Sequence, residues 1–246
     1  MPNKIAYLTI DDSPSASMDQ KLDYLLRKKI PAVWFCNGAL IEERPEPAIR
    51  AIREGFLIGN HAYQHPHFSD LTLDECFAQI RRGDEVIEAL YAQVGVQRPI
   101  KCFRFPYGDK GGFQPNALGP YSTEGQEHKQ AIQAYLRELG YHQPIWEHIH
   151  YAYYRTGGLQ DDVDWFWTYD TIDWSIGLAE PALETDTYKK VMARMDEDDP
   201  ESGLGLNQGD SAEIVLMHDH AHMAAYFEPL VERLLEKGLT FKQIDW

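Results

Sequence analysis

Short apolar runs rich in β-branched and aromatic residues alternate along the chain with longer amphipathic segments. This alternation is typical of a chain in which strands and helices follow one another. Six apolar runs predict strands, over residues 5–10, 32–36, 56–59, 101–105, 165–170 and 214–219. The amphipathic segments predict helices over 17–29, 72–94 and 127–139. The second helix begins with the capping box Thr72-x-x-Glu75, and the third ends before Gly140.

Strand and helix alternation predicts an α/β fold with a parallel sheet, which we expect to close into a barrel. The 246 residues, of which 43% are hydrophobic, can bury a substantial core. No Ser/Gly-rich or Pro-rich linker and no repeat divides the chain, so we expect one domain over residues 1–246. In such folds the functional side chains follow the carboxyl ends of the strands.

The formal net charge of −16 argues against a nucleic-acid or anionic-membrane partner, because a polyanion would be repelled. The three cysteines, Cys36, Cys76 and Cys102, have no CxxC spacing and indicate neither a disulfide framework nor a cysteine zinc site. The first strand-like run begins almost at Met1 and leaves no room for a secretory signal. We therefore expect a cytoplasmic protein, or a secreted one if the chain is trimmed from a longer precursor. Oligomeric state is not readable from the sequence.

Two polar clusters follow predicted strands and contain metal-ligating residue types. His61 and His65, in "FLIGNHAYQHPHF", are four residues apart and would lie on one side of a helical turn, aimed at a common point. Asp11 and Asp12 follow the first strand, and a metal bound to one of them would relieve their mutual repulsion. A solvated turn and a surface helix with incidental histidines are the alternatives. We do not expect His67 to be a ligand.

Two further clusters offer groups for acid–base chemistry. In "RFPYGD", Arg104 could orient a carboxylate, and the turn that follows could direct a backbone N–H into a site. In "LMHDHAH", His218 is the strongest functional candidate, and we expect His220 and His222 to be peripheral.

Together these stretches resemble the polysaccharide deacetylase family with the NodB homology domain, carbohydrate esterase family 4. The five motifs fall in the family's order. They are "TIDDSPS" for T-F-D-D-G-P, "HAYQH" for H-S/T-x-x-H, "RFPYG" for R-x-P-Y, "DTIDW" for D-x-x-D-W and "LMHD" for L-x-H.

The resemblance implies a distorted (β/α) barrel and the metal-dependent removal of N- or O-acetyl groups from a poly- or oligosaccharide. It implies that Asp12, His61 and His65 hold one divalent metal ion. Zinc suits these ligands, and cobalt, nickel or iron would also fit them.

The resemblance also implies catalytic roles. Asp11 would be the general base, with Arg104 pairing with it and orienting it. The backbone N–H of Tyr107 would stabilise the oxyanion. His218 would be the general acid, kept cationic by Asp173. The implied substrate-binding residues are Trp174, Leu216 and Pro106, of which Trp174 and Leu216 would wall the acetyl pocket.

The chain departs from the family pattern at several positions. Ile10 and Ser13 replace the common Phe and Gly around the aspartates, and Ala62 removes a hydroxyl that could brace the loop between the ligands. An aromatic-rich insertion at about 109–168 could contact a sugar or form a packed cap over the barrel.

A second stretch, "DDVDW", also satisfies D-x-x-D-W and makes Asp164 and Trp165 the fallback for Asp173 and Trp174. We prefer the later match because a strand-like run leads directly into it.

Two other functions remain open. NodB-like barrels also resemble hydrolases of small cyclic amides, which would suit a cytoplasmic protein. A non-catalytic sugar-binding protein is the third possibility, but the intact base, acid and metal triad weigh against it. A cytoplasmic location would favour acetylated oligosaccharides or a small sugar conjugate over a cell-wall polymer.

Overall fold

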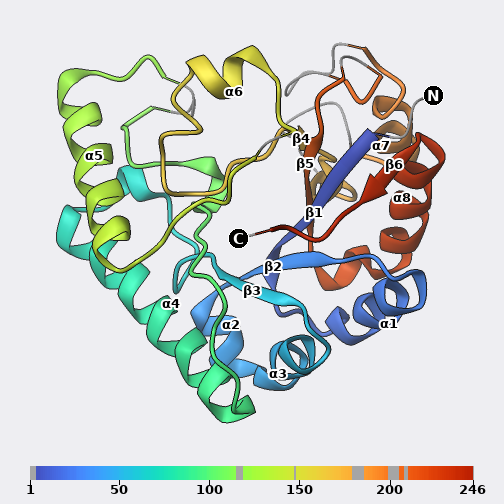
Figure 1. Cartoon of the computed structure of the whole chain (residues 1–246), viewed down its shortest axis with the longest axis horizontal. Helices are drawn as coiled ribbons and strands as arrows, with labels where there is room; N and C mark the ends of the chain where they lie inside the picture. Colours follow the sequence, from blue (N-terminus) through green and yellow to red (C-terminus); the bar gives the residue numbers. More distant parts are fainter. Residues whose placement is uncertain are drawn as a thin grey trace.

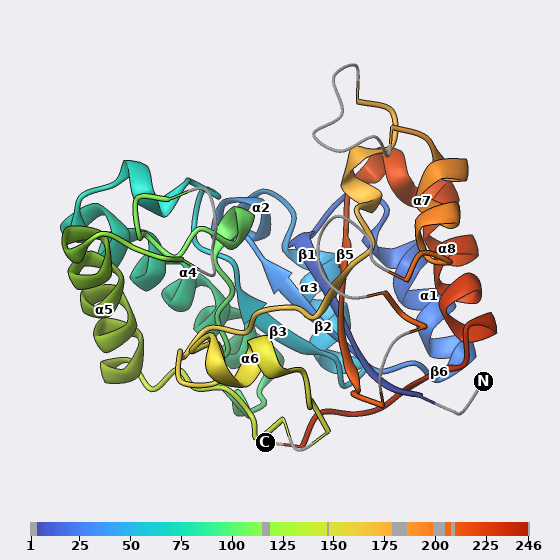
Figure 2. The same cartoon turned by 90° about the horizontal axis from the view of Figure 1, so that it is seen from above.

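The computed structural model of the chain describes residues 4–114, 119–146, 148–178, 186–198, 205–207 and 210–245. Figure 1 and Figure 2 show helices arranged around a twisted sheet. The strands are β1 Lys4–Ser13, β2 Ala32–Cys36, β3 Leu57–Asn60, β4 Tyr169–Asp170, β5 Glu213–His218 and β6 Leu239–Phe241. The helices are α1 Met18–Lys28, α2 Gly38–Glu43, α3 Pro45–Arg53, α4 Leu73–Val94, α5 Thr123–Glu138, α6 Ala152–Thr156, α7 Tyr188–Arg194 and α8 Ala224–Glu236.

The sheet is parallel in every pairing of the described strands. Its order is β3-β2-β1-β5-β4, and β6 pairs with the first residues of β1. All residues of β2 and β3 are buried, which explains why these strands read as continuous apolar runs rather than as alternating ones. Because β1 is the central strand of this order, its carboxyl end lies in the middle of the edge at which the parallel strands end.

Two extended segments, 101–105 and 165–168, continue the ring of strands between β3 and β5. Both were predicted as strands, but they make few backbone hydrogen bonds, so the first contributes a single bridge and the second leads into the two-residue β4. The bonds run from Asn60 N to Cys102 O, from Arg104 N to Asn60 O, from Trp165 N to Phe103 O and from Thr168 N to Ile214 O. The chain therefore has the predicted α/β fold, in the form of a distorted barrel.

The helices differ from the sequence prediction mainly in number. The α1 and α4 helices match the predicted ranges, and the Thr72–Glu75 capping box is formed. The α5 helix begins four residues earlier than predicted, because Ser122 caps it through the Gly125 N–H. The α2, α3, α6, α7 and α8 helices were not predicted, although α3 has the helix-start signal of a proline in its first turn.

The described residues of the segment predicted as an insertion, 109–168, lie along one side of the barrel (Figure 1). Its helix α5 lies beside α4 (Figure 1), and Ile132 and Leu136 share a hydrophobic cluster with Phe103 and Phe105. Because 165–168 already belongs to the ring of strands, the part outside the barrel ends before Trp165. The extent of the insertion, and the single domain, stay predictions.

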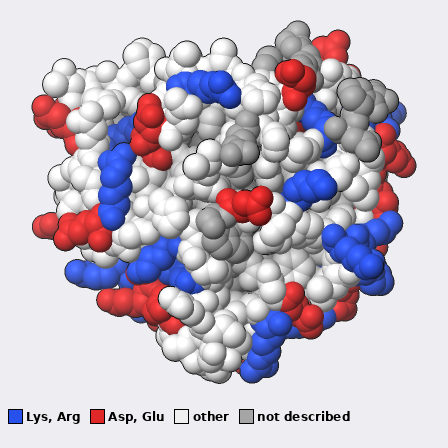
Figure 3. All heavy atoms as spheres, in the orientation of Figure 1, with Lys and Arg blue, Asp and Glu red and all other residues white. Residues whose placement is uncertain are grey.

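The charged side chains on the face in Figure 3 are mixed in sign, with acidic and basic groups interspersed around its rim. In the part of the chain that the structure describes, no helix is both long and apolar enough to cross a lipid bilayer.

A buried ion pair joins α1 to the loop that follows β5. The ammonium group of Lys21 donates to Asp219 Oδ1 and to the backbone carbonyl of His220, and both charged side chains are almost fully buried. Asp219 also accepts hydrogen bonds from the N–H and the hydroxyl of Ser15. The loops after β1 and β5 are therefore held together by one buried carboxylate.

We predict that Lys21→Met lowers the free energy of unfolding by about 3–5 kcal/mol, because Asp219 would be left buried without its counter-charge. Urea denaturation followed by circular dichroism measures this change. The matched control is Lys28→Met on the same helix, whose partner Glu232 is half exposed, and which should change stability little. Equal effects of the two substitutions would show that burial of the pair is unimportant.

Candidate active site

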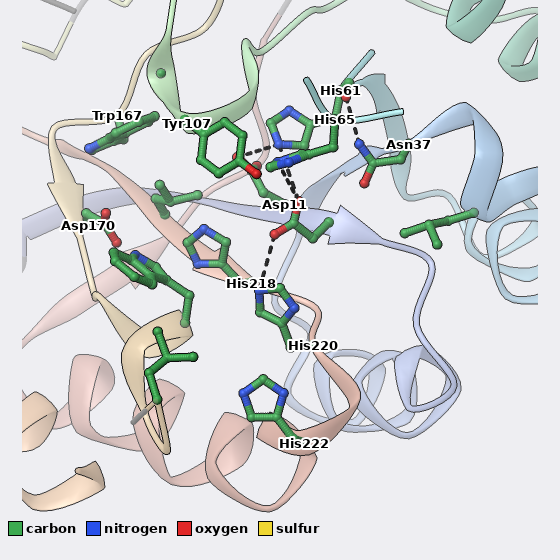
Figure 4. Close-up of a pocket in the computed structure, with 16 residues that line it drawn as sticks. Asp11, Asn37, His61, His65, Tyr107, Trp167, Asp170, His218, His220 and His222 are labelled. Atoms are coloured by element: carbon green, nitrogen blue, oxygen red, sulfur yellow. Dashed lines mark hydrogen bonds and ion pairs between the residues drawn. The ribbon is translucent and has the colours of Figure 1, made fainter. Parts of the chain in front are cut away.

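A pocket of about 590 Å³ opens at the carboxyl ends of the strands, where β1, β3 and β5 end (Figure 4). Asp11 and Asp12 come from β1, His61 and His65 from the loop after β3, and His218 from the end of β5. Strands of one parallel sheet end at the same edge, so residues far apart in sequence meet there.

A bulge in β1 explains how two adjacent carboxylates reach one pocket. Successive side chains of a regular strand point to opposite faces. Here Ile10 pairs with Trp34 and Ser13 pairs with Cys36, so two residues of β1 stand opposite one residue of β2. Asp12 has a φ of 62°, in the left-handed region. This local turn lets both carboxylates line the pocket, as bulges beside active sites often do.

The loop after β3 brings His61 and His65 together, but not by a helical turn as the sequence analysis predicted. The residues between them are not helical, and Ala62 and His65 have φ values of 62° and 61°. The imidazole rings nevertheless lie 4.9 Å apart between centroids. The prediction of a helical turn is therefore wrong. Tertiary contacts hold the loop in left-handed conformations that the spacing of the histidines does not indicate.

Asp12, His61 and His65 form a group that could hold a metal ion. Asp12 Oδ1 lies 3.0 Å from His65 Nε2 and 3.5 Å from His61 Nε2. His61 Nδ1–H donates to the Arg104 carbonyl at 2.8 Å, which leaves the lone pair of Nε2 free to coordinate. Burial lowers the pKa of His61 and favours its neutral form. One carboxylate oxygen and two imidazole nitrogens are a donor set that suits zinc and related divalent ions.

The pKa of Asp12 also fits this use. Burial opposes ionisation of Asp12, but hydrogen bonds with His220 and His65 and the nearby His61 hold the pKa well below its ordinary value. The carboxylate of Asp12 therefore ionises more readily than that of an ordinary aspartate.

Asp11 is placed differently from its neighbour. Its Oδ1 accepts a hydrogen bond from the guanidinium of Arg104 at 2.9 Å, and its Oδ2 lies 3.6 Å from His61 Nε2. Arg104 is 1% exposed and also donates to Thr9 Oγ1 and to the Trp165 carbonyl. Asp11 thus has one oxygen held by the guanidinium of Arg104 and the other directed towards His61.

His218 pairs with Asp173, as the preferred D-x-x-D-W match predicted. His218 Nδ1–H donates to Asp173 Oδ1 at 2.8 Å, and the His218 backbone N–H donates to Asp173 Oδ2 at 3.0 Å. Burial disfavours the imidazolium, but the charge of Asp173 and its hydrogen bond outweigh burial and raise the pKa of His218 to about 10. The fallback residue Asp164 instead pairs with Lys110 and Gln133, away from the pocket.

Asp170, Asp173 and His218 form a second group whose atoms lie close enough to hold a cation. Both oxygens of Asp173 are already hydrogen-bonded to His218. Burial raises the pKa of Asp170, whose Oδ1 accepts from the Ile172 N–H. We assign no metal to this group, because a cation there would replace the imidazolium that Asp173 stabilises.

The predicted substrate-contacting residues divide into two sets. Trp174 and Leu216 line the pocket, and so does Tyr107, whose predicted role is catalytic. Pro106 does not, because it begins the short turn 106–108 and is buried within it. The Tyr107 ring is 60% exposed and stacks on His67 at a centroid distance of 3.8 Å.

Three features of the pocket were not expected from the sequence. His220 and His222 line it rather than lying at its periphery, and Figure 4 shows them in a row with His218. Asn37, which follows β2, lines the pocket and donates to the His61 carbonyl at 2.8 Å. Of the described residues in 109–168, only Trp167 reaches the pocket, which favours packing over substrate contact for the rest of that segment.

Comparison with known proteins identifies related sequences. The model of the polysaccharide deacetylase family matches residues 1–118. The peptidoglycan-N-acetylmuramic acid deacetylase PdaC of Bacillus subtilis is 37% identical over 109 residues, which are 44% of this chain and 22% of that protein. A chitooligosaccharide deacetylase of Rhizobium leguminosarum bv. trifolii is 33% identical over 92 residues, 37% of this chain and 43% of that protein. The chain thus covers less than half the length of these two relatives.

Other similarities extend over the whole chain. A peptidoglycan-N-acetylglucosamine deacetylase of Bacillus cereus is 25% identical over 245 residues, 97% of this chain and 68% of that protein. A solved family 4 carbohydrate esterase from Streptomyces lividans superposes with a TM-score of 0.61 at 22% identity, covering 100% of this chain and 95% of that one. The structural likeness shows that the two chains share a fold.

We predict that NMR titration of the His218 imidazole finds a pKa of about 10, and that Asp173→Asn lowers it towards the ordinary value of about 6.5. Because the folded-state pKa is raised, the pair stabilises the fold fully below about pH 6.5, and this contribution is lost as the pH rises through about 10. Asp164→Asn is the control and should leave the His218 pKa unchanged. A shift with Asp164→Asn alone would contradict the assignment of Asp173.

Proposed function

Because residues 1–118 match the model of the polysaccharide deacetylase family, we propose that the chain is a metal-dependent hydrolase that removes N- or O-acetyl groups from a carbohydrate. One observation supports this proposal most directly. A group of metal-binding side chains, a carboxylate paired with an arginine and a histidine paired with an aspartate all face one pocket. Acetyl transfer to water needs these three kinds of group together.

Asp12, His61 and His65 would hold one divalent cation, for which zinc is our first proposal. When bound, such a cation polarises an acetyl carbonyl and acidifies water. These three residues supply one carboxylate and two imidazoles, and cobalt, nickel or iron would accept the same donors.

Asp11 acts as the general base in this proposal. Arg104 holds Oδ1, so Oδ2 is the oxygen that can take a proton from the attacking water. The guanidinium also fixes the plane of the carboxylate, because Arg104 is itself held by Thr9 and by the Trp165 carbonyl. Attack by water on the acetyl carbon forms the new C–O bond and places negative charge on the carbonyl oxygen.

His218 acts as the general acid. Its Nδ1–H is bonded to Asp173, so the proton on Nε2 is the one available to the leaving amine or alkoxide. The backbone N–H of Tyr107, in the turn that lines the pocket, would donate to the developing oxyanion. Cleavage of the bond to the acetyl carbon then releases acetate and the deacetylated sugar.

The walls of the pocket support a carbohydrate as substrate. The aromatic side chains of Tyr107, Trp167 and Trp174 line it, and apolar ring faces of this kind suit the faces of sugar rings. The relatives reported above are named as deacetylases of peptidoglycan and of chitooligosaccharides. We therefore propose an acetylated carbohydrate as the partner of this site.

The first experiment measures acetate release from acetylated chito-oligosaccharides, xylo-oligosaccharides and monosaccharides by the metal-loaded protein, with and without chelator. Release that chelator abolishes is the expected result, and the preferred sugar would identify the substrate class. No release from any substrate by protein that contains metal would overturn the proposal and favour a cyclic-amide hydrolase or a sugar-binding protein.

We predict that Asp11→Asn keeps the bound metal and the fold but lowers kcat by about 10²–10⁴-fold, because the base is lost. His61→Ala should lose both metal and activity, since it removes a ligand. Metal content by mass spectrometry, together with acetate release, separates the two variants. Full activity of Asp11→Asn would show that another group accepts the proton.

A further inference from the structure

The carboxylate of Asp12 has two oxygens, and they meet different histidines. Oδ1 faces the two proposed ligands, His65 at 3.0 Å and His61 at 3.5 Å. Oδ2 lies 3.2 Å from His220 Nε2. His220 does not belong to the group of three side chains that converge on a possible cation. His220 therefore contacts Asp12 Oδ2, the oxygen that does not face the two proposed ligands.

The position of His220 is set by contacts on both its backbone and its ring. Its carbonyl accepts a hydrogen bond from the buried ammonium of Lys21 at 3.2 Å, and the preceding Asp219 is bonded to Ser15. The imidazole stacks between two others, at 5.7 Å from His218 and 5.4 Å from His222. The ring is thus oriented before any ligand is bound.

Because the acceptor is a carboxylate, the contact requires a proton on His220 Nε2. We propose that His220 is a positioning residue that donates this N–H to Asp12 Oδ2 and so presents Oδ1 to the cation, an inference that rests on the proposed metal dependence. Aspartate carboxylates rotate about the bond to Cβ, and holding one oxygen in place reduces the freedom lost when the other coordinates. Hydrogen-bond partners of metal ligands affect affinity in this way in other proteins.

The test compares substitutions of His220 with substitutions of two other histidines that line the pocket. His220→Ala removes the donor, and His220→Gln keeps an N–H on a side chain of similar reach. His222→Ala removes an imidazole that stacks on His220 and lines the same pocket, with no contact to Asp12 recorded among the described residues. His61→Ala removes a proposed ligand and sets the scale for loss of the site.

The experiment measures the Kd for Zn²⁺ of each full-length variant by competition with a chromophoric chelator, and the thermal unfolding of each metal-free variant. We expect His220→Ala to bind Zn²⁺ about 10–100-fold more weakly than the wild type, with unchanged unfolding of the metal-free protein. His220→Gln should recover most of the affinity. His222→Ala should match the wild type, and His61→Ala should bind no Zn²⁺ at the site.

Several outcomes would overturn the inference. Equal affinity of His220→Ala and the wild type would show that the contact has no effect on the site. Loss as complete as in His61→Ala would make His220 a ligand itself, and equal losses in His220→Ala and His222→Ala would indicate a general effect on the pocket. If the wild type binds no Zn²⁺, the proposed metal dependence fails as well. If it binds Zn²⁺ and releases acetate, a null result with His220→Ala removes this inference alone.

Discussion

Arg104 carries a positive charge on a side chain that is 1% exposed, and the site is organised around it. A buried guanidinium needs partners for its charge and its N–H groups. Here they are the Asp11 carboxylate, the Thr9 hydroxyl and the Trp165 carbonyl. The Arg104 carbonyl also accepts from His61 Nδ1. One residue therefore orients the proposed base, selects the tautomer of a proposed ligand and ties β1 to the segment that closes the barrel.

The two carboxylates at the end of β1 show how like charges can share one pocket. Two bare, ionised carboxylates would repel each other strongly when buried. The bulge turns both towards the pocket, but each meets a different counter-group, with Arg104 beside Asp11 and imidazoles beside Asp12. The two carboxylates can therefore have different roles. Arg104 holds one oxygen of Asp11 and leaves the other free, while His220 contacts Asp12 Oδ2 and leaves Oδ1 facing His61 and His65.

The alternation of strands and helices predicted the fold. The motifs predicted that Asp11, Asp12, His61, His65 and His218 would meet at one edge of the sheet, since side chains that follow parallel strands share it. The choice between Asp173 and Asp164 agreed with the structure because a strand-like run precedes Asp173. The bulge and the loop that holds His61 and His65 could not be predicted, because left-handed backbone at non-glycine residues is imposed by tertiary contacts. His220 was missed for a similar reason, since its spacing from His218 says nothing about where the loop after β5 turns.

The proposed base and the proposed acid lie on neighbouring strands, which sets their separation. Asp11 and His218 are register partners in the β1–β5 pairing, and the Asp219 N–H donates to the Asp11 carbonyl at 2.8 Å. Neighbouring strands lie about 4.8 Å apart. A slip of one residue in this pairing would send His218 to the opposite face of the sheet. The pairing of β1 with β5 thus also fixes the separation of the proposed base and the proposed acid. Precise placement of the two groups follows from backbone hydrogen bonding that the fold requires in any case.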